Sequence, residues 1–282
     1  MTTTMTTKKK MSKSKMLYNL SGVLKILLGV TIAFPIIYGL WMSINTNGNI
    51  AAMRYFTFEF TFENYKEVFT EFNVFRYVLN SFMYVAISVC SQVVTCSLAA
   101  YSLVFFNYKF KGLLFTIITL TMMIPGDSII IANYMTVNAL GLNDTYLGIA
   151  ITSLTSGMGI FLMRQSFATV PFELKEAAEI DGCGRMRFLF EILVPVSIPS
   201  IAAMAIYLFI SNYNMFFWPL LVTSKDSMRT IQVGVSLLMN EETGQFGSQC
   251  SVAIVALIVP IFVFVVAYKY LVKGMTAGAV KG

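Results

Sequence analysis

The chain has 282 residues, of which 57% are hydrophobic and only 12% charged, and its mean hydropathy is +0.72. Soluble domains carry about 25% charged residues, so this composition excludes an ordinary soluble globular protein. The chain contains no histidine, which excludes Ser-His-Asp and Cys-His catalysis and removes the commonest metal ligand.

The formal net charge of +6 comes from basic residues that are not gathered on one folded face. We interpret them as the cytoplasmic flanks of membrane spans and expect no nucleic-acid partner. The dipeptide Gly-Lys does not occur, so the chain has no Walker A loop and any ATP must be bound by another chain. The four cysteines form no CxxC pair, and we expect core residues rather than disulfides or metal ligands (Cys90, Cys96, Cys183 and Cys250).

Six apolar runs predict six membrane-spanning helices, because a span needs about 20 apolar residues. The runs lie at about 26–44, 77–105, 113–135, 146–163, 195–222 and 251–272. The first ends in Asn45-Thr46-Asn47 without a small-residue cleavage site, so we interpret it as a retained span and not as a signal peptide. The expected parts are a cytoplasmic tail (1–20), the first transmembrane helix with an outer loop (21–76), a five-helix core (77–272) containing a polar loop (165–194), and a cytoplasmic tail (273–282).

The orientation follows from the distribution of lysine and arginine, which favour the cytoplasmic side of a membrane. With both termini inside, fifteen basic residues face the cytoplasm and five face outward (Arg54, Lys66, Arg76, Lys225 and Arg229). The sequence therefore predicts cytoplasmic termini and a cytoplasmic location for the polar loop 165–194.

Two outer loops are long. Residues 45–76 contain Phe-Thr-Phe-Glu-Phe-Thr-Phe-Glu from Phe56 to Glu63, and this alternation predicts a short strand or an extended segment. The second loop covers about 223–247. No internal repeat is evident, which argues against a secondary transporter built from repeated halves.

Asp127 follows Pro125-Gly126 in the third apolar run. An ionisable side chain inside a span is a functional hypothesis by default, and Pro-Gly is expected to break the helix beside a water-filled cavity. Two interpretations stay open at this point. Asp127 either contacts the substrate, or it caps the broken helix or bonds a partner subunit.

The fifth run carries aromatic and amide side chains that suit a sugar path, because sugar C–H faces stack on rings while hydroxyls pair with amides. These residues are Asn212, Tyr213, Asn214 and Trp218. The alternative is the membrane interface, where Trp and Tyr are also enriched. Three further amides are expected to form interhelical hydrogen bonds (Gln92, Asn133 and Asn138).

The polar loop predicts a helix, a turn and a second helix. Pro171 suits the first helical position, and Glu173 and Glu176 are expected in the opening turn, where the helix dipole favours acidic residues. A narrow apolar face is expected from Phe172, Ala177 and Ile180.

Gly182 permits the left-handed conformation that ends a helix, and 185–190 begins another. The small Ala177-Ala178 pair is expected to let a partner surface approach the backbone.

The spacing of this loop resembles the EAA loop of ABC-importer permeases. That pattern is Glu-Ala-Ala, three residues, Gly, nine residues, Ile, one residue and Leu-Pro. Here it is Glu176-Ala177-Ala178, Gly182, Ile192 and Val194-Pro195, with Val194 in place of Leu.

Motifs from about residue 20 onward are similar to those of the maltose-type carbohydrate permeases. They are Asn80-Ser81, Met123-Ile124-Pro125, Gly141-Leu142-Asn143-Asp144-Thr145-Tyr146, Phe161-Leu162-Met163-Arg164-Gln165, Trp218-Pro219-Leu220 and the ending Thr276–Gly282. One departure is Tyr213-Asn214, where relatives commonly have Trp-Asn.

The resemblance implies an all-α polytopic membrane protein with the six-helix type I ABC importer permease fold and a cytoplasmic coupling loop. It implies the permease subunit of an ATP-driven, binding-protein-dependent sugar importer in the bacterial cytoplasmic membrane, surrounded by lipid. The partners would be a homologous second permease, two ATPase subunits and an extracytoplasmic sugar-binding protein. ATP and Mg²⁺ would reside on the ATPase subunits, and this chain would hold no catalytic residue, cofactor or metal.

The resemblance also assigns residues. Contact with the ATPase would use Glu176, Ala177, Ala178, Asp181, Gly182 and Pro195, together with the tail residues Ala277, Gly278, Ala279, Val280, Lys281 and Gly282. The loop 223–247 would reach into the binding protein, and the tail is expected to be extended and slender.

Two alternatives remain. In the first, the same kind of importer carries glycerol phosphate or another small polar solute. A phosphate ester favours cationic side chains in the path, and the predicted spans hold none except Lys25 at one end. The other is an ion-coupled secondary transporter, for which one intramembrane Asp is weak support.

Overall fold

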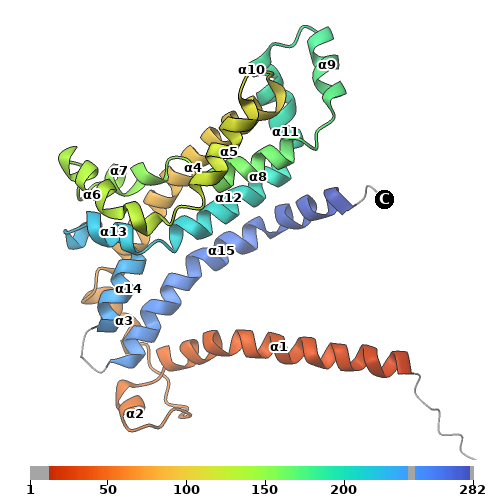
Figure 1. The fold of residues 1–282 in the computed structure, drawn as a ribbon. Coiled ribbons are helices and arrows are strands. Elements are labelled where there is room, and N and C mark those ends of the chain that lie inside the picture. The colour runs from red at the N-terminus through yellow and green to blue at the C-terminus, as the bar shows by residue number, and fades with distance from the viewer. Residues whose placement is uncertain (1–12, 241–244, 280–282) are drawn as a thin grey trace, which may run out of the picture. The chain divides into compact units, whose positions relative to one another are not determined.

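A computed structural model describes residues 13–240 and 245–279, with side chains placed for 21–239 and 245–268. Its secondary structure there is helical, apart from one antiparallel bridge between Asn45 and Phe60 (Figure 1). The all-α class is therefore confirmed. In chain order the elements are α1 (Lys13–Ser43), α2 (Asn47–Ala51), α3 (Glu63–Thr70), α4 (Val74–Phe105), α5 (Lys111–Thr121), η1 (Gly126–Ile129), α6 (Ile130–Ala139), α7 (Tyr146–Ala150), η2 (Ile151–Ser153), α8 (Gly157–Phe167), α9 (Phe172–Ile180), α10 (Arg185–Arg187), η3 (Phe188–Leu193), α11 (Val194–Val196), α12 (Ile198–Tyr213), α13 (Phe217–Val222), η4 (Asp226–Met228), α14 (Ile231–Asn240) and α15 (Phe246–Ala279).

Three stretches in the described part are each long and apolar enough to cross a membrane: Ser21–Ser43, Val74–Phe105 and Phe246–Tyr268. Three further helix pairs pass the same test only when taken together, and they are bent by 88°, 51° and 80°. These pairs are Lys111–Thr121 with Gly126–Ala139, Tyr146–Ser153 with Gly157–Phe167, and Arg185–Val196 with Ile198–Tyr213. Counting each bent pair as one span gives the six that the sequence predicts.

Two spans differ from their predicted form. The run 146–163 is broken by a bend of 51°, although it contains no proline. The run 195–222 is also divided: α12 ends at Tyr213, and residues 217–222 form the separate helix α13.

The chain divides into two compact units. The first comprises Met1–Tyr65 and Gly244–Ile254. Within it Asn64 donates hydrogen bonds to the carbonyls of Ser43 (2.9 Å) and Asn45 (2.7 Å), and Ser251 donates to Ser43 (3.1 Å). The domain boundaries predicted at residues 20, 76 and 272 stay predictions.

The second unit comprises Lys66–Thr243 and Val255–Gly282, and its core is built around α4. Helix α4 packs most extensively against α8 and α12. Gly159 permits the close approach of α8, because a Cβ atom there would lie 2.7 Å from the sulfur of Cys96. Small residues at helix contacts are the usual means of close packing in membranes.

A buried polar network crosses this core. Asn212 donates to the side-chain oxygen of Gln92 (2.9 Å) and accepts from the hydroxyl of Tyr84 (3.2 Å). The interhelical role predicted for Gln92 is therefore confirmed. The four cysteines are unbridged.

Candidate functional site

The polar loop lies at one end of the second unit, where α9 stands apart from the long helices (Figure 1). Pro171 immediately precedes α9 with φ −58°, one position earlier than predicted. Glu173 lies in the first turn, where its carboxylate is favoured by the helix dipole. The same position predicted for Glu176 is wrong, because the helix begins at Phe172 and Glu176 lies beyond its first turn.

Gly182 ends α9 as predicted, with φ +76°. The N–H of Cys183 donates to the carbonyl of Ala178 (2.8 Å), and the N–H of Gly182 donates to that of Glu179 (3.1 Å). These two bonds are the Schellman arrangement, which satisfies carbonyls at the end of a helix and requires the left-handed residue. The turn into the next helix therefore depends on glycine at position 182.

The two alanines of the loop face different ways. Ala178 is 5% exposed and belongs to the hydrophobic cluster formed by α4, α8 and η3, together with Phe105 and Phe188. Ala177 is exposed, and Ile180 is 86% exposed. The Ala178 side chain packs α9 against its own chain, and the approach of a partner to the backbone of this pair stays a prediction. The outward surface carries Ala177 and Ile180.

The acidic residues of the loop also fall into two groups, one paired within the chain and one facing outward. Glu179 pairs with Lys175 at 2.9 Å, one helical turn away. In the described part of the chain, Glu173, Glu176 and Asp181 are exposed and have no ion-pair partner. The loop thus presents unpaired carboxylates beside an exposed isoleucine, a combination suited to a basic and apolar partner surface.

A π-helical turn, η3, follows the loop. Pro195 has no N–H to donate to the carbonyl of Glu191, and its ring crowds that carbonyl, so a regular α-helical turn is disfavoured there. The wider turn accommodates the proline, and π turns occur frequently at functional sites.

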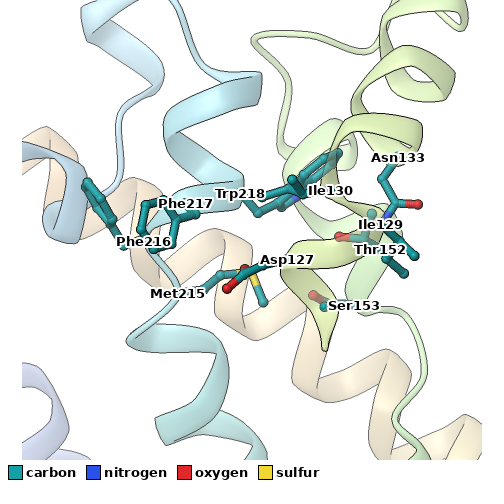
Figure 2. Close-up of a pocket in the computed structure, with 11 residues that line it drawn as sticks. Asp127, Ile129, Ile130, Asn133, Thr152, Ser153, Met215, Phe216, Phe217 and Trp218 are labelled. Atoms are coloured by element: carbon teal, nitrogen blue, oxygen red, sulfur yellow. The ribbon is translucent and has the colours of Figure 1, made fainter. Parts of the chain in front are cut away.

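A hollow of about 360 Å³ lies beside α6 and α13 (Figure 2), which are at the end of the second unit away from α9 (Figure 1). Its walls come from η1 and α6, which form the second half of the bent third span, from η2, and from the segment 215–218 at the start of α13. It is lined by Gly126, Asp127, Ile129, Ile130, Asn133, Thr152, Ser153, Met215, Phe216, Phe217 and Trp218.

Asp127 is exposed and is the one charged residue among those lining this hollow. The break predicted at Pro125-Gly126 is confirmed, because the helices on either side diverge by 88°. The helix η1 begins after Pro125, and the Asp127 side chain has no ion-pair partner within the described ranges. Contact of Asp127 with the substrate or with a partner subunit stays a prediction.

The structure places the four residues predicted on the fifth run in different environments. Trp218 lines the hollow, and its indole N–H donates to the carbonyl of Ile149 (3.0 Å). Asn212 and Tyr213 are 3% exposed and bonded within the core, where the Tyr213 hydroxyl donates to the carbonyl of Ala256 (2.8 Å). Asn214 is exposed but does not line the hollow. Of the four residues, only Trp218 lines this hollow, and a role of the other three in the substrate path stays a prediction.

Several lining residues were missed. Asn133 was interpreted as an interhelical partner, but it lines the hollow. Thr152 and Ser153 lie where the fourth span bends, and Met215 to Phe217 lie in the gap after α12. The polar run Thr152-Ser153, followed by Ser156-Gly157, is the signal that would have revealed the bend.

The second outer loop is held against the start of α4. Asp226 accepts hydrogen bonds from the Tyr77 hydroxyl and the Asn73 amide (2.7 Å), and it pairs with Arg229 at 2.9 Å. Asn80 donates to the carbonyls of residues 227 and 229 (both 2.9 Å). The predicted loop therefore contains a clamped turn and then helix α14, while residues 241–244 lie outside the described residues.

The pKa of the Asp226 carboxyl is lowered. Burial acts to raise it, but the hydrogen bonds from Tyr77 and Asn73 and the positive charge of Arg229 outweigh that effect. A depressed carboxyl pKa stabilises the clamp above the unfolded pKa, and this stabilisation is lost as the pH falls through the folded pKa.

Asp226→Asn is expected to open the clamp, because asparagine cannot pair with Arg229. Hydrogen exchange over 223–230 should be several-fold faster than in the unmodified protein at pH 7. The difference should vanish as the pH falls through the lowered pKa, where the unmodified carboxyl also becomes neutral. Equal exchange at pH 7 would contradict the role of Asp226.

The C-terminal tail is only partly described. Ala277 to Ala279 form the last residues of helix α15, so the extended conformation predicted there is wrong for these three. Val280, Lys281 and Gly282 lie outside the described residues.

Comparison with known proteins assigns the chain to a family. Residues 92–277 match the model of the family described as "Binding-protein-dependent transport system inner membrane component". The sn-glycerol-3-phosphate transport system permease protein UgpE of Brucella melitensis is 33% identical over 269 residues, which cover 91% of this chain and 95% of that protein. The proteins of the same name from Agrobacterium fabrum and Rhizobium meliloti are 34% and 32% identical, over 89% and 94% of this chain and 94% and 98% of theirs.

A solved structure shares the fold. It is a crystal structure of a bacterial ABC transporter involved in the import of the acidic polysaccharide alginate, with a TM-score of 0.80 and 22% identity. The similarity covers 93% of this chain and 99% of that one. This similarity confirms the type I permease fold, and the family match over residues 92–277 argues against the secondary-transporter alternative. The chain belongs to the binding-protein-dependent transport system inner membrane components and is a permease subunit of an ABC importer.

Proposed function

We propose that the chain forms half of the translocation path of an ATP-driven sugar importer, with oligosaccharides as the preferred cargo. A homologous second permease would supply the other half. Family membership implies an ATPase and a binding protein as partners. In our proposal two ATPase subunits hold ATP and Mg²⁺, and the binding protein delivers sugar from outside.

We base the proposed substrate class on the charge of the residues that line the hollow. Asp127 contributes a carboxylate, Asn133 an amide and Thr152 a hydroxyl, while Trp218 and the neighbouring phenylalanines contribute aromatic surface. Hydroxyl groups donate to carboxylates and amides, and sugar C–H faces pack on rings. A phosphate ester would be repelled by the carboxylate and would find no cation among the lining residues.

The curated relatives favour the alternative, because they are named as sn-glycerol-3-phosphate permeases. Two solutes therefore need to be compared directly. The complex should be purified with its own ATPase, second permease and binding protein and reconstituted in vesicles. Uptake of labelled maltooligosaccharide and of labelled sn-glycerol 3-phosphate should then be measured with ATP inside.

Sugar uptake without phosphate-ester uptake is the expected result. Uptake of glycerol phosphate alone would overturn the sugar assignment but leave the permease assignment intact. Calorimetry on the co-purifying binding protein provides an independent check of which solute the system carries.

We propose that docking on the ATPase uses the outward surface of α9. Its support is the combination of exposed Glu176, Asp181 and Ile180 with a turn that depends on Gly182. The matching orientation has both termini in the cytoplasm, as the fifteen-to-five distribution of basic residues favours.

The C-terminal tail provides a further test. Deleting 277–282 is expected to leave the complex assembled but to slow substrate-stimulated ATP hydrolysis, because we propose that this tail packs between the ATPase subunits. Stimulated hydrolysis and uptake should be measured against the full-length chain. Rates equal to those of the full-length complex would show that the tail has no coupling role.

A further inference from the structure

The loop that follows α1 exposes a row of phenylalanines. Four of them alternate along the chain between positions 56 and 62, and their exposed fractions are 83%, 83%, 52% and 74% (Phe56, Phe58, Phe60 and Phe62). We refer to these four residues as the phenylalanine ridge. Such exposure is unusual for aromatic side chains, and contiguous exposed apolar surface marks a contact with another protein or with a membrane.

The polar residues between them are turned toward their own chain. Thr57 donates to the side-chain oxygen of Asn45 (3.1 Å), and Asn49 donates to Thr57 (3.2 Å) and to the carboxylate of Glu59 (2.9 Å). The bridge between Asn45 and Phe60 keeps this segment extended. Successive side chains of an extended chain lie on opposite sides, so the phenylalanine ridge lies on the side opposite to these hydrogen bonds.

The ridge is continuous with a membrane span. Phe58 and Phe60 pack edge-on against Trp41, with ring centroids 6.0 and 5.4 Å apart. Trp41 lies in the last turn of α1, and its indole N–H donates to the carbonyl of Tyr55 (2.7 Å). The most apolar part of Ser21–Ser43 contains no residue that is buried within this chain. The apolar surface of the span therefore extends onto the ridge.

We propose that the phenylalanine ridge is an interfacial anchor, which lies side-on in the boundary between lipid headgroups and acyl chains next to the end of α1. Aromatic side chains concentrate at that depth of a bilayer. Arg54 is exposed and has no ion-pair partner in the described part of the chain, so it is available to a lipid phosphate. A protein-docking patch would instead be expected to carry a rim of polar side chains, but Thr57 and Glu59 are engaged on the opposite side.

Spin-label accessibility tests this in the assembled complex. Single cysteines at Phe58 and Phe62 would be labelled in a background whose four native cysteines are replaced, and the complex would be placed in lipid nanodiscs. Glu59 and Glu63 serve as matched positions in the same segment. Collision rates with oxygen, which partitions into lipid, and with a water-soluble nickel chelate would be measured at each site.

The oxygen-to-nickel ratio is expected to be several-fold higher at Phe58 and Phe62 than at Glu59 and Glu63. Nickel access at the two phenylalanine positions equal to that at the glutamates would show that the ridge lies in water. Low access to both reagents would show that protein covers it. Either result overturns the anchor.

A more conservative substitution tests the proposal even if the cysteine variants fail to assemble. Phe62→Trp keeps an aromatic ring, and Glu63→Trp is its control. Lipids brominated near the headgroup are expected to quench the fluorescence of the Phe62→Trp variant more than they quench that of the protein with its native tryptophans alone. No added quenching, or equal quenching of the control, would also overturn the proposal.

Discussion

Replacing Gly182 with valine is expected to abolish uptake while leaving the chain inserted in the membrane. The residue occupies φ +76°, and the two bonds that close the end of α9 depend on this conformation. No atom stands within 4 Å of where a Cβ atom would be placed, so the effect comes from the backbone and not from a clash. A left-handed conformation at a non-glycine residue costs about 1–3 kcal/mol, and a β-branched residue is especially unsuited to it.

The sequence provides a matched control two residues away. Gly184 also has free space around it, but its φ is −70°, so Gly184→Val should have little effect. Gly182→Asn should retain most activity, because asparagine tolerates the left-handed region. ATPase-subunit co-purification and uptake would be measured for all three variants. Unchanged assembly and uptake in Gly182→Val would refute docking through this turn.

Asp127→Asn is expected to lower sugar uptake about tenfold or more without altering the assembled complex or its basal ATP hydrolysis. A hydrogen bond to a charged group contributes about 1.5–3 kcal/mol, and each 1.4 kcal/mol corresponds to a factor of ten. The Asp127 carboxylate is exposed at the hollow and has no ion-pair partner within the described ranges, so the change should act on the solute and not on the fold.

Ser128→Ala is the control for Asp127, because Ser128 lies in the same short helix but does not line the hollow. Uptake, co-purification and basal hydrolysis should be compared for both variants. If Asp127→Asn dissociates the complex, the carboxylate bonds the partner permease instead. If uptake is unchanged, it has no part in the path.

The polar loop was the most predictable part of the chain. Its proline, its acidic first turn and its glycine each have a fixed local meaning, and the structure places a helix and a left-handed residue where they indicate. Local chemistry did not decide which alanine would face inward. That depends on the position of the cluster around Phe188, which only the tertiary fold determines.

The hollow was harder to predict for a related reason. A membrane span is apolar on every side, so its periodicity does not distinguish the face toward a cavity from the face toward another helix. Asn212 and Tyr213 have side chains of the kind that bind sugars, which is why the sequence places them in a substrate path. In the structure they lie in the core, where Asn212 donates to Gln92 and Tyr213 donates to the carbonyl of Ala256. The bend in the third span was predictable from Pro125-Gly126. The fourth span bends without a proline, and its serine and threonine residues were a weaker signal.

The π turn between residues 188 and 193 has a consequence for the register of the whole segment. Relative to a regular helix it holds one additional residue, and each residue of an α-helix rotates the chain by about 100°. A natural or engineered chain that lacks one residue in 188–193 would lose this additional residue, although the proline at position 195 would still oppose a regular α-helical turn. Its polar loop would then face a different direction from α12, by roughly a quarter of a circle. Length in this short stretch is thus constrained as tightly as residue type, and single-residue deletions here should be tolerated far less than in the connection 106–110.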